Sequence, residues 1–264
     1  MKGCIGYMVA TMVVIGAVAV GLYYTDSIAS IARFTPDNNG HMFLSTNDMI
    51  RFLKNDADRY VASLTAADLA ARGVSTQSGY LDLAVAAAAQ FDGTEKARLL
   101  QAAAAADARL LRVCGIPGFD GVKAALLPWS FAKMVGRTYE GGLPHTRMDV
   151  IFLPSEAVRS KDDAGLIDLL IHEKVHIYER ACPDDMFQFL QANKYIQWKP
   201  RSMEPLIRAN PDVDPYIYIN PVTKNEMAAY YTSAEPSSVS DVEPLDFADE
   251  HPYEWLAYQI VAKR

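Results

Sequence analysis

The chain has few cysteines and lacks several motifs that mark common catalytic classes. It contains 3 cysteines in 264 residues and no Cys-x-x-Cys pair, which excludes a disulfide-dense fold and a dithiol redox motif. No Gly-rich phosphate loop and no Gly-x-Ser-x-Gly elbow occurs, so the signatures of nucleotide hydrolysis and of serine hydrolases are missing. Cys114 and Cys182 either form one disulfide or remain two buried free thiols.

Basic residues are fewer than acidic residues. Lysine and arginine number 25 against 32 aspartates and glutamates, which gives a formal net charge of -7. Binding to a phosphate backbone needs a positive surface. We therefore expect no nucleic-acid partner or substrate.

Charge is absent altogether from one early segment, Ile5–Tyr24. Its length is sufficient for a helix to cross a hydrocarbon layer of ~30 Å, and tyrosines at both ends suit the membrane interface. We predict that residues 1–25 form a single-pass anchor with a cytoplasmic N-terminus and an extracytoplasmic catalytic part. The alternative is a cleaved signal peptide, since Ala17-Val18-Ala19 offers an A-x-A site, and then the protein would be secreted.

Two further regions follow the predicted anchor. Residues 26–45 are largely polar and indicate a linker, and residues 46–264 are long enough for one catalytic domain. Within that domain, residues 46–140 are alanine-rich and predict helices, with Thr65 and Asp68 at capping-box spacing. The side chains that suggest a catalytic function lie within residues 141–264.

The pentapeptide His172-Glu173-Lys174-Val175-His176 is the strongest chemical signal. Side chains four apart lie on the same face of a helix, so His172 and His176 can bind one metal ion. Glu173 lies about 100° round the helix axis, beside the two ligands, where its carboxylate can accept a proton from a metal-activated water. This pattern predicts a catalytic Zn²⁺ site with Glu173 as general base.

The flanks of this motif predict a buried helix. Ser160 with Asp163 has capping-box spacing at the start, and Pro183 marks the stop. Lys174 is unusual between two ligands, and we expect its amine to extend to solvent. The apolar residues that surround the motif are Leu166, Ile167, Leu169, Leu170, Ile171, Val175 and Ile177.

A catalytic zinc keeps three protein ligands and one open position, so a third ligand must come from elsewhere. Glu179 continues the histidine face but lies a turn too far, and a solvated position or a hydrogen bond to a ligand suits it better. Glu226 and Glu254 each begin a Glu-x-x-Ala segment. We predict Glu254, because Pro252 suits the first turn of an amphipathic helix, whereas residues 216–231, around Glu226, indicate two short strands joined by an Asn-Pro turn. Glu226 and Glu250 stay in reserve.

The HExxH helix and the distal Glu-x-x-Ala helix resemble the gluzincin branch of the zincin metallopeptidases over about residues 145 to 264. The segments at 142–147 and 149–153 also resemble uncharacterised putative metallopeptidases of large DNA viruses and bacteria. The resemblance implies an α+β zincin-like fold with a small sheet. It also implies that the strand Val150–Leu153 lies at the sheet edge, where an extended substrate would pair with it. The composition of this segment fits an ordinary buried strand equally well.

The resemblance further implies a hydrogen-bond donor for the oxyanion, usually a Tyr or His. In thermolysin-like gluzincins an acid four residues after the ligand Glu orients a histidine, and here that position is Tyr258. Asp168 or Asp249 could replace it. The candidate donors are Tyr195, Tyr218, Tyr230, Tyr231, His251 and His145.

These patterns predict a membrane-anchored zinc metallopeptidase that hydrolyses a peptide or protein substrate. One alternative is a catalytically inactive zincin fold that serves as a structural or interaction protein, for example in a virion or envelope. Another is a zinc amidase that acts on a non-peptide amide. The motif specifies the chemistry but not the shape of the pocket.

Overall fold

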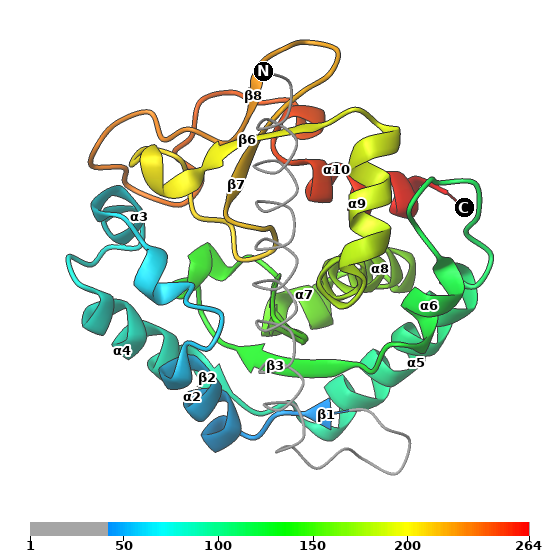
Figure 1. The fold of residues 1–264 in the computed structure, drawn as a ribbon. Coiled ribbons are helices and arrows are strands. Elements are labelled where there is room, and N and C mark those ends of the chain that lie inside the picture. Colours follow the sequence, from blue (N-terminus) through cyan, green and yellow to red (C-terminus); the bar gives the residue numbers. More distant parts are fainter. Residues whose placement is uncertain (1–41, 264) are drawn as a thin grey trace, which may run out of the picture. The chain divides into compact units, whose positions relative to one another are not determined.

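The computed structural model describes residues 42–263, apart from the side chains of Met42 and Phe247. These residues form a mixed α+β fold, which confirms the predicted class (Figure 1). None of the helices in this range has the length and apolar composition needed to cross a membrane. The predicted anchor at residues 1–25 lies outside the described residues.

Helices dominate the first part of the described chain, as its alanine-rich composition predicts. Thr65 and Asp68 form the predicted capping box at the start of α3. The longest helix of this part is capped by Asp92, whose carboxylate accepts from the amide of Glu95. The helices are α2 (Thr46–Asn55), α3 (Ala66–Ala71), α4 (Gln77–Ala87), α5 (Gly93–Leu110) and α6 (Gly121–Leu126).

A five-stranded sheet lies beside these helices. Its order is β1-β3-β5-β4, with β2 paired to β3; β1, β3 and β5 are parallel, and β4 runs antiparallel to β5. The strand β1 falls within residues predicted as linker. The strands are β1 (Met42–Phe43), β2 (Ala88–Ala89), β3 (Ser130–Met134), β4 (His145–Arg147) and β5 (Val150–Pro154).

The sheet corrects the predicted position of Val150–Leu153. This segment forms most of β5, which is paired on both sides, with β3 and with β4. All of its residues are buried. The terminal strand next to the helix that carries His172 and His176 is β4, because a tight turn at Met148 and Asp149 folds the preceding residues back onto β5.

The second half of the chain adds four helices and a small antiparallel sheet. The predicted strand pair at 216–231 is present as β7 and β8. The elements are α7 (Ser155–Ser160), α8 (Asp163–Ala181), α9 (Pro183–Ala192), β6 (Ile196–Pro200), β7 (Tyr216–Ile219), β8 (Glu226–Met227) and α10 (Pro252–Ala262).

The helix α8 occupies the centre of the main core, between α5 and α10 (Figure 1). It begins later than the capping-box spacing predicts, because Asp162, and not Ser160, caps it by accepting from the Gly165 amide at 2.7 Å. Nearly every side chain from Leu170 to Glu179 is buried. The surrounding apolar residues therefore fix the orientation of the motif.

Lys174 does not reach solvent, contrary to the sequence prediction. Its side chain is 0% exposed and its Nζ lies 2.7 Å from Asp107 Oδ1 on α5. The ammonium also lies 4.0 Å from the ring centroid of Trp129. Burial lowers the pKa of Lys174 to about 8, against the opposing effect of Asp107. The lysine thus projects away from the histidines and ties α8 to α5.

This pair predicts an asymmetry in stability. Asp107→Ala should lower the free energy of unfolding by about 3 kcal/mol, because it leaves a buried charge without its partner. Lys174→Met should cost only about 1 kcal/mol, because the Asp107 side chain is 28% exposed and can hydrate. Urea denaturation of both variants measures the difference. Equal losses of unfolding free energy in the two variants would contradict the buried position of Lys174.

Candidate metal centre

Helix α8 brings the two histidines of the motif together. The Nε2 atoms of His172 and His176 lie 3.1 Å apart, and their rings meet edge to face at 79°. His176 is fully buried, whereas His172 retains partial exposure. Two ring nitrogens so close need a proton or a cation between them, since two lone pairs repel each other.

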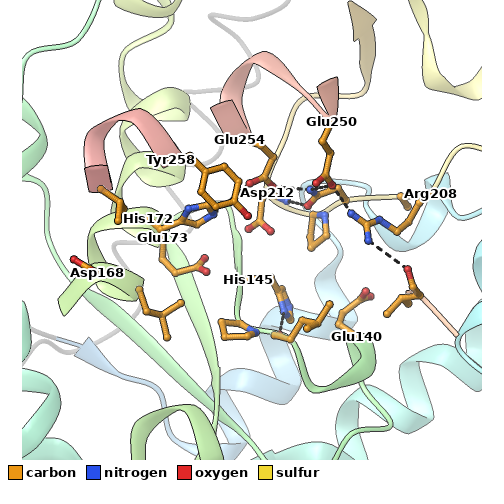
Figure 2. A pocket seen from close by; sticks show the side chains of 18 of the residues that line it. Glu140, His145, Asp168, His172, Glu173, Arg208, Asp212, Glu250, Glu254 and Tyr258 are labelled. Carbon is orange, nitrogen blue, oxygen red and sulfur yellow. Dashed lines mark hydrogen bonds and ion pairs between the residues drawn. The ribbon is translucent and has the colours of Figure 1, made fainter. Parts of the chain in front are cut away.

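Helix α10 supplies the carboxylate. Pro252 is its first residue, and His251 caps it by accepting from the Tyr253 amide at 3.2 Å. Glu254 Oε2 lies 3.2 Å from His172 Nε2 and 3.7 Å from His176 Nε2. The structure thus brings together the three residues that the sequence analysis selects, and their role as metal ligands stays a prediction. Figure 2 shows two of them, His172 and Glu254.

The donor set fits zinc in type and spacing. Ligand atoms about 2.0–2.1 Å from a tetrahedral ion lie about 3.3 Å apart, which is close to the three separations observed here. Two imidazole nitrogens and one carboxylate oxygen are a common catalytic zinc set. Within residues 42–263 no other group of three His, Cys, Asp or Glu side chains converges in this way.

Glu179 orients the more deeply buried histidine. Its Oε2 lies 2.8 Å from His176 Nδ1, and both side chains are fully buried. A proton on Nδ1 would be donated to this carboxylate, which leaves the Nε2 lone pair directed at Glu254 and His172. Of the two positions expected for Glu179, solvated or hydrogen-bonded to a histidine of the motif, the structure shows the hydrogen bond to His176.

The centre attracts positive charge. Burial disfavours the imidazolium of His176, but Glu179 and Glu254 more than offset this and raise its pKa well above the ordinary value. Burial likewise opposes ionisation of Glu254, yet His176 and His172 hold its pKa well below the usual range. A cation between these groups would satisfy all three donors at once.

Glu173 lies beside the three donors and is held by a residue that the sequence analysis missed. Thr146 Oγ1 on β4 donates to Glu173 Oε2 at 2.8 Å. Glu173 is 2% exposed. Burial, reinforced by the charge of Glu254, raises the pKa of Glu173 to about 7. A carboxyl group with a pKa near neutrality is suited to accepting and releasing a proton.

A second missed contribution comes from the loop before β7. Asn210 Nδ2 donates to Glu254 Oε1 at 2.7 Å, which leaves Oε2 facing the histidines. Asp212 Oδ1 accepts from the Thr146 amide at 2.5 Å. The Asn-Pro-Asp tripeptide at 210–212 signals a turn in the sequence, but its contacts with α10 and β4 arise only in the folded chain.

A cavity of about 510 Å³ is bordered by His172, Glu173, Asn210, Asp212 and Glu254. Figure 2 shows the carboxylates of Glu173, Asp212 and Glu254 directed toward one another within it. Its volume lies in the range of small-molecule sites. Other lining residues are Arg72, Glu140, His145, Lys161, Asp168, Leu169, Arg208, Glu250, Tyr258 and Val261.

The reserve ligands belong to other clusters. Glu226 on β8 binds Lys199 at 2.9 Å and accepts from Tyr230 at 2.6 Å. Glu250 lines the cavity, but its carboxylate pairs with Arg208. Of the three glutamates, Glu254 alone joins the histidines in the group found among the described residues.

Most of the proposed oxyanion donors face other partners. Tyr218 donates to Asp214 at 2.6 Å, and Tyr231 donates to Asp68 at 3.2 Å. His145 lines the cavity, but its ring nitrogens contact the Leu143 carbonyl and the Tyr139 hydroxyl. Burial lowers the pKa of His145 to about 4, so it is neutral at physiological pH.

Tyr258 occupies the position at which thermolysin-like gluzincins carry an acid. Its ring packs edge to face on His172, with centroids 5.0 Å apart, and it lines the cavity. The two acids considered as replacements lie in other contacts. Asp168 pairs with Arg109, and Asp249 accepts from Asn220 at 2.6 Å.

No protein-family model, no curated protein and no solved structure matches this chain. The function of the protein is therefore inferred from the motif and from the geometry of the three donors.

The geometry predicts which glutamate affects metal binding. Glu254→Ala should lower zinc affinity by about 100-fold or more, because it removes one of three convergent donors. Glu226→Ala should leave the affinity unchanged. Competition with a chromogenic chelator measures both, with His172→Ala/His176→Ala as the metal-free reference. Loss of zinc in Glu226→Ala, with retention in Glu254→Ala, would reverse the assignment.

Proposed function

We propose that this protein is a zinc-dependent metallopeptidase of gluzincin type, with a zincin-like domain and a catalytic centre at His172, Glu173, His176 and Glu254. The observation that carries the proposal is the convergence of His172 Nε2, His176 Nε2 and Glu254 Oε2, at separations of 3.1–3.7 Å, beside a buried carboxylate. The HExxH motif and this donor set together favour metal-assisted hydrolysis of an amide.

When bound, zinc would polarise a carbonyl group and acidify water. The chain supplies the remaining functions. Glu173 accepts a proton from the attacking water and delivers it to the leaving amine. Thr146 holds the Glu173 carboxylate through its hydroxyl at 2.8 Å, and Glu179 holds the His176 ring. Glu173, His176 and Glu254 are buried, which strengthens each of these interactions.

The proposed substrate is a peptide, and the proposed location is a membrane surface reached through the charge-free segment Ile5–Tyr24. An inactive zincin-like module is less well supported, because such modules have no use for the base. Here Glu173 is kept buried and hydrogen-bonded at a cost in desolvation.

The proposal is tested by Glu173→Gln. The variant should bind zinc as the wild type does, because Glu173 is not one of the three donors. Its kcat on a mixed library of unstructured peptides should fall by about 100- to 10 000-fold. Mass spectrometry of the library measures turnover, with the exposed Glu235→Gln as the matched control. Hydrolysis that persists in Glu173→Gln would refute the general base.

We also propose Tyr258 as the hydroxyl donor to the reacting carbonyl. It lines the cavity, and its ring packs edge to face on His172, with centroids 5.0 Å apart. Burial, together with the charge of Glu254, raises the pKa of Tyr258 to about 12. Its hydroxyl therefore keeps its proton at neutral pH and remains a donor.

Tyr258→Phe should lower kcat by about 100-fold and leave zinc affinity and KM nearly unchanged, because the hydroxyl would act mainly on charge that develops in the transition state. Tyr253→Phe, on the same helix but in contact with His251 and Tyr218, is the control. Steady-state kinetics on one selected peptide separates kcat from KM. An unchanged kcat would remove Tyr258 from the mechanism.

A further inference from the structure

The outer edge of β4 is the place where an extended substrate would pair with the sheet. Arg147 and Val150 face each other across the tight turn, and Thr146 faces Ile151. In an antiparallel pair, hydrogen-bonded and non-bonded positions alternate. The amide and carbonyl of Thr146 therefore point away from β5, toward the site of an added strand.

Both of these backbone groups already have partners within the chain. The Thr146 amide donates to Asp212 Oδ1 at 2.5 Å. The Thr146 carbonyl accepts from Arg180 Nη2 at 3.4 Å. Pro144, two residues earlier on the same side of the strand, has no N–H to offer. The backbone groups of Thr146 that would bond to a substrate strand are therefore already hydrogen-bonded to side chains of the protein.

The segment Ala209–Asp212, here termed the strap, is held firmly in this place. Arg180 Nη2 donates to the Pro211 carbonyl at 2.6 Å, and Arg180 Nη1 donates to the His176 carbonyl at 2.8 Å. Asn210 bonds to Glu254 at 2.7 Å and also accepts from the Asp212 amide at 2.9 Å.

The other end of the strap is anchored in the helical part. The Ala209 amide donates to Asp68 Oδ1 at 2.7 Å, and the Ala209 carbonyl accepts from Arg72 at 3.2 Å. Asp68 is 0% exposed and Arg72 is 6% exposed. Moving the strap would leave these buried groups without partners, which is costly.

We propose that the strap takes the place of a substrate strand, so that the site accepts short peptides that fit the cavity and disfavours extended protein segments. This inference rests on the proposed peptidase function and narrows its substrate class. Pro211 and Asp212 line the cavity of about 510 Å³ beside the metal donors. A short peptide can enter this space without pairing with β4.

The first test is a length series on the zinc-loaded wild-type protein. Peptides that share one scissile sequence, from tripeptides to an unfolded protein, are compared by kcat/KM. We expect kcat/KM to fall by about tenfold or more between the short peptides and the long chains. A kcat/KM that rises steadily with length would overturn the inference and leave the peptidase proposal intact.

The second test compares two substitutions at Asp212. Asp212→Ala frees the Thr146 amide, whereas Asp212→Asn keeps an oxygen acceptor and removes only the charge. The ratio of long-chain to short-peptide kcat/KM should rise by about tenfold in Asp212→Ala. It should stay close to the wild-type value in Asp212→Asn. Equal ratios in the two variants would show that the hydrogen bond between the Thr146 amide and Asp212 does not keep long chains from the edge of β4.

Hydrogen exchange provides a readout that needs no activity. The Thr146 amide should be protected in the wild type and in Asp212→Asn, and should exchange at least tenfold faster in Asp212→Ala. If zinc binds and no peptide of any length is cleaved, the peptidase proposal fails, while exchange still reports on the strap. Rapid exchange of the Thr146 amide in the wild type would overturn the inference that the strap blocks the edge of β4.

Discussion

The packing of α10 against α8 is the contact on which the centre depends. It places Glu254 Oε2 within 3.2 Å of His172 and 3.7 Å of His176, in an environment with little access to water. A carboxylate and two imidazoles gain from such proximity only when a proton or cation lies between them. The apolar core that surrounds both helices keeps the three donors together at that spacing.

Helix α8 carries two histidines on one side and a positively charged lysine on the other, and the fold keeps them apart. The histidines face α10, while Lys174 faces Asp107 and Trp129. A positive charge between the two proposed ligands in the sequence is compatible with a metal site, because the helix directs the lysine away from the histidines. The same ion pair joins α8 to α5, so the scaffold of the motif is fixed by a polar contact as well as by apolar packing.

Thr146 connects the proposed chemistry to the proposed substrate preference. Its hydroxyl binds Glu173, its amide binds Asp212, and its carbonyl binds Arg180. Arg180 in turn belongs to α8 and contacts the His176 carbonyl. A displacement of the strap would thus also disturb Glu173, the proposed base, and helix α8, because Thr146 contacts all three.

The sequence by itself determined the parts that depend on local periodicity. The helix that carries His172 and His176 and the helix that begins at Pro252 follow from spacing, caps and apolar patterns. The choice of Glu254 over Glu226 also followed from local signals, a proline at a helix start against a strand pattern. Each of these features is decided by neighbours within a few residues. The α+β class came from the resemblance to zincins.

Only the tertiary structure decided that β4 is the terminal strand beside α8 and that Lys174 points toward α5. It also decided that Thr146, Asn210 and Asp212 lie beside the proposed centre. Strand order depends on how a tight turn folds β4 onto β5, and a buried lysine depends on a partner 67 residues away. Contacts between residues so distant in the chain leave no periodic pattern, because they form only when separate elements pack.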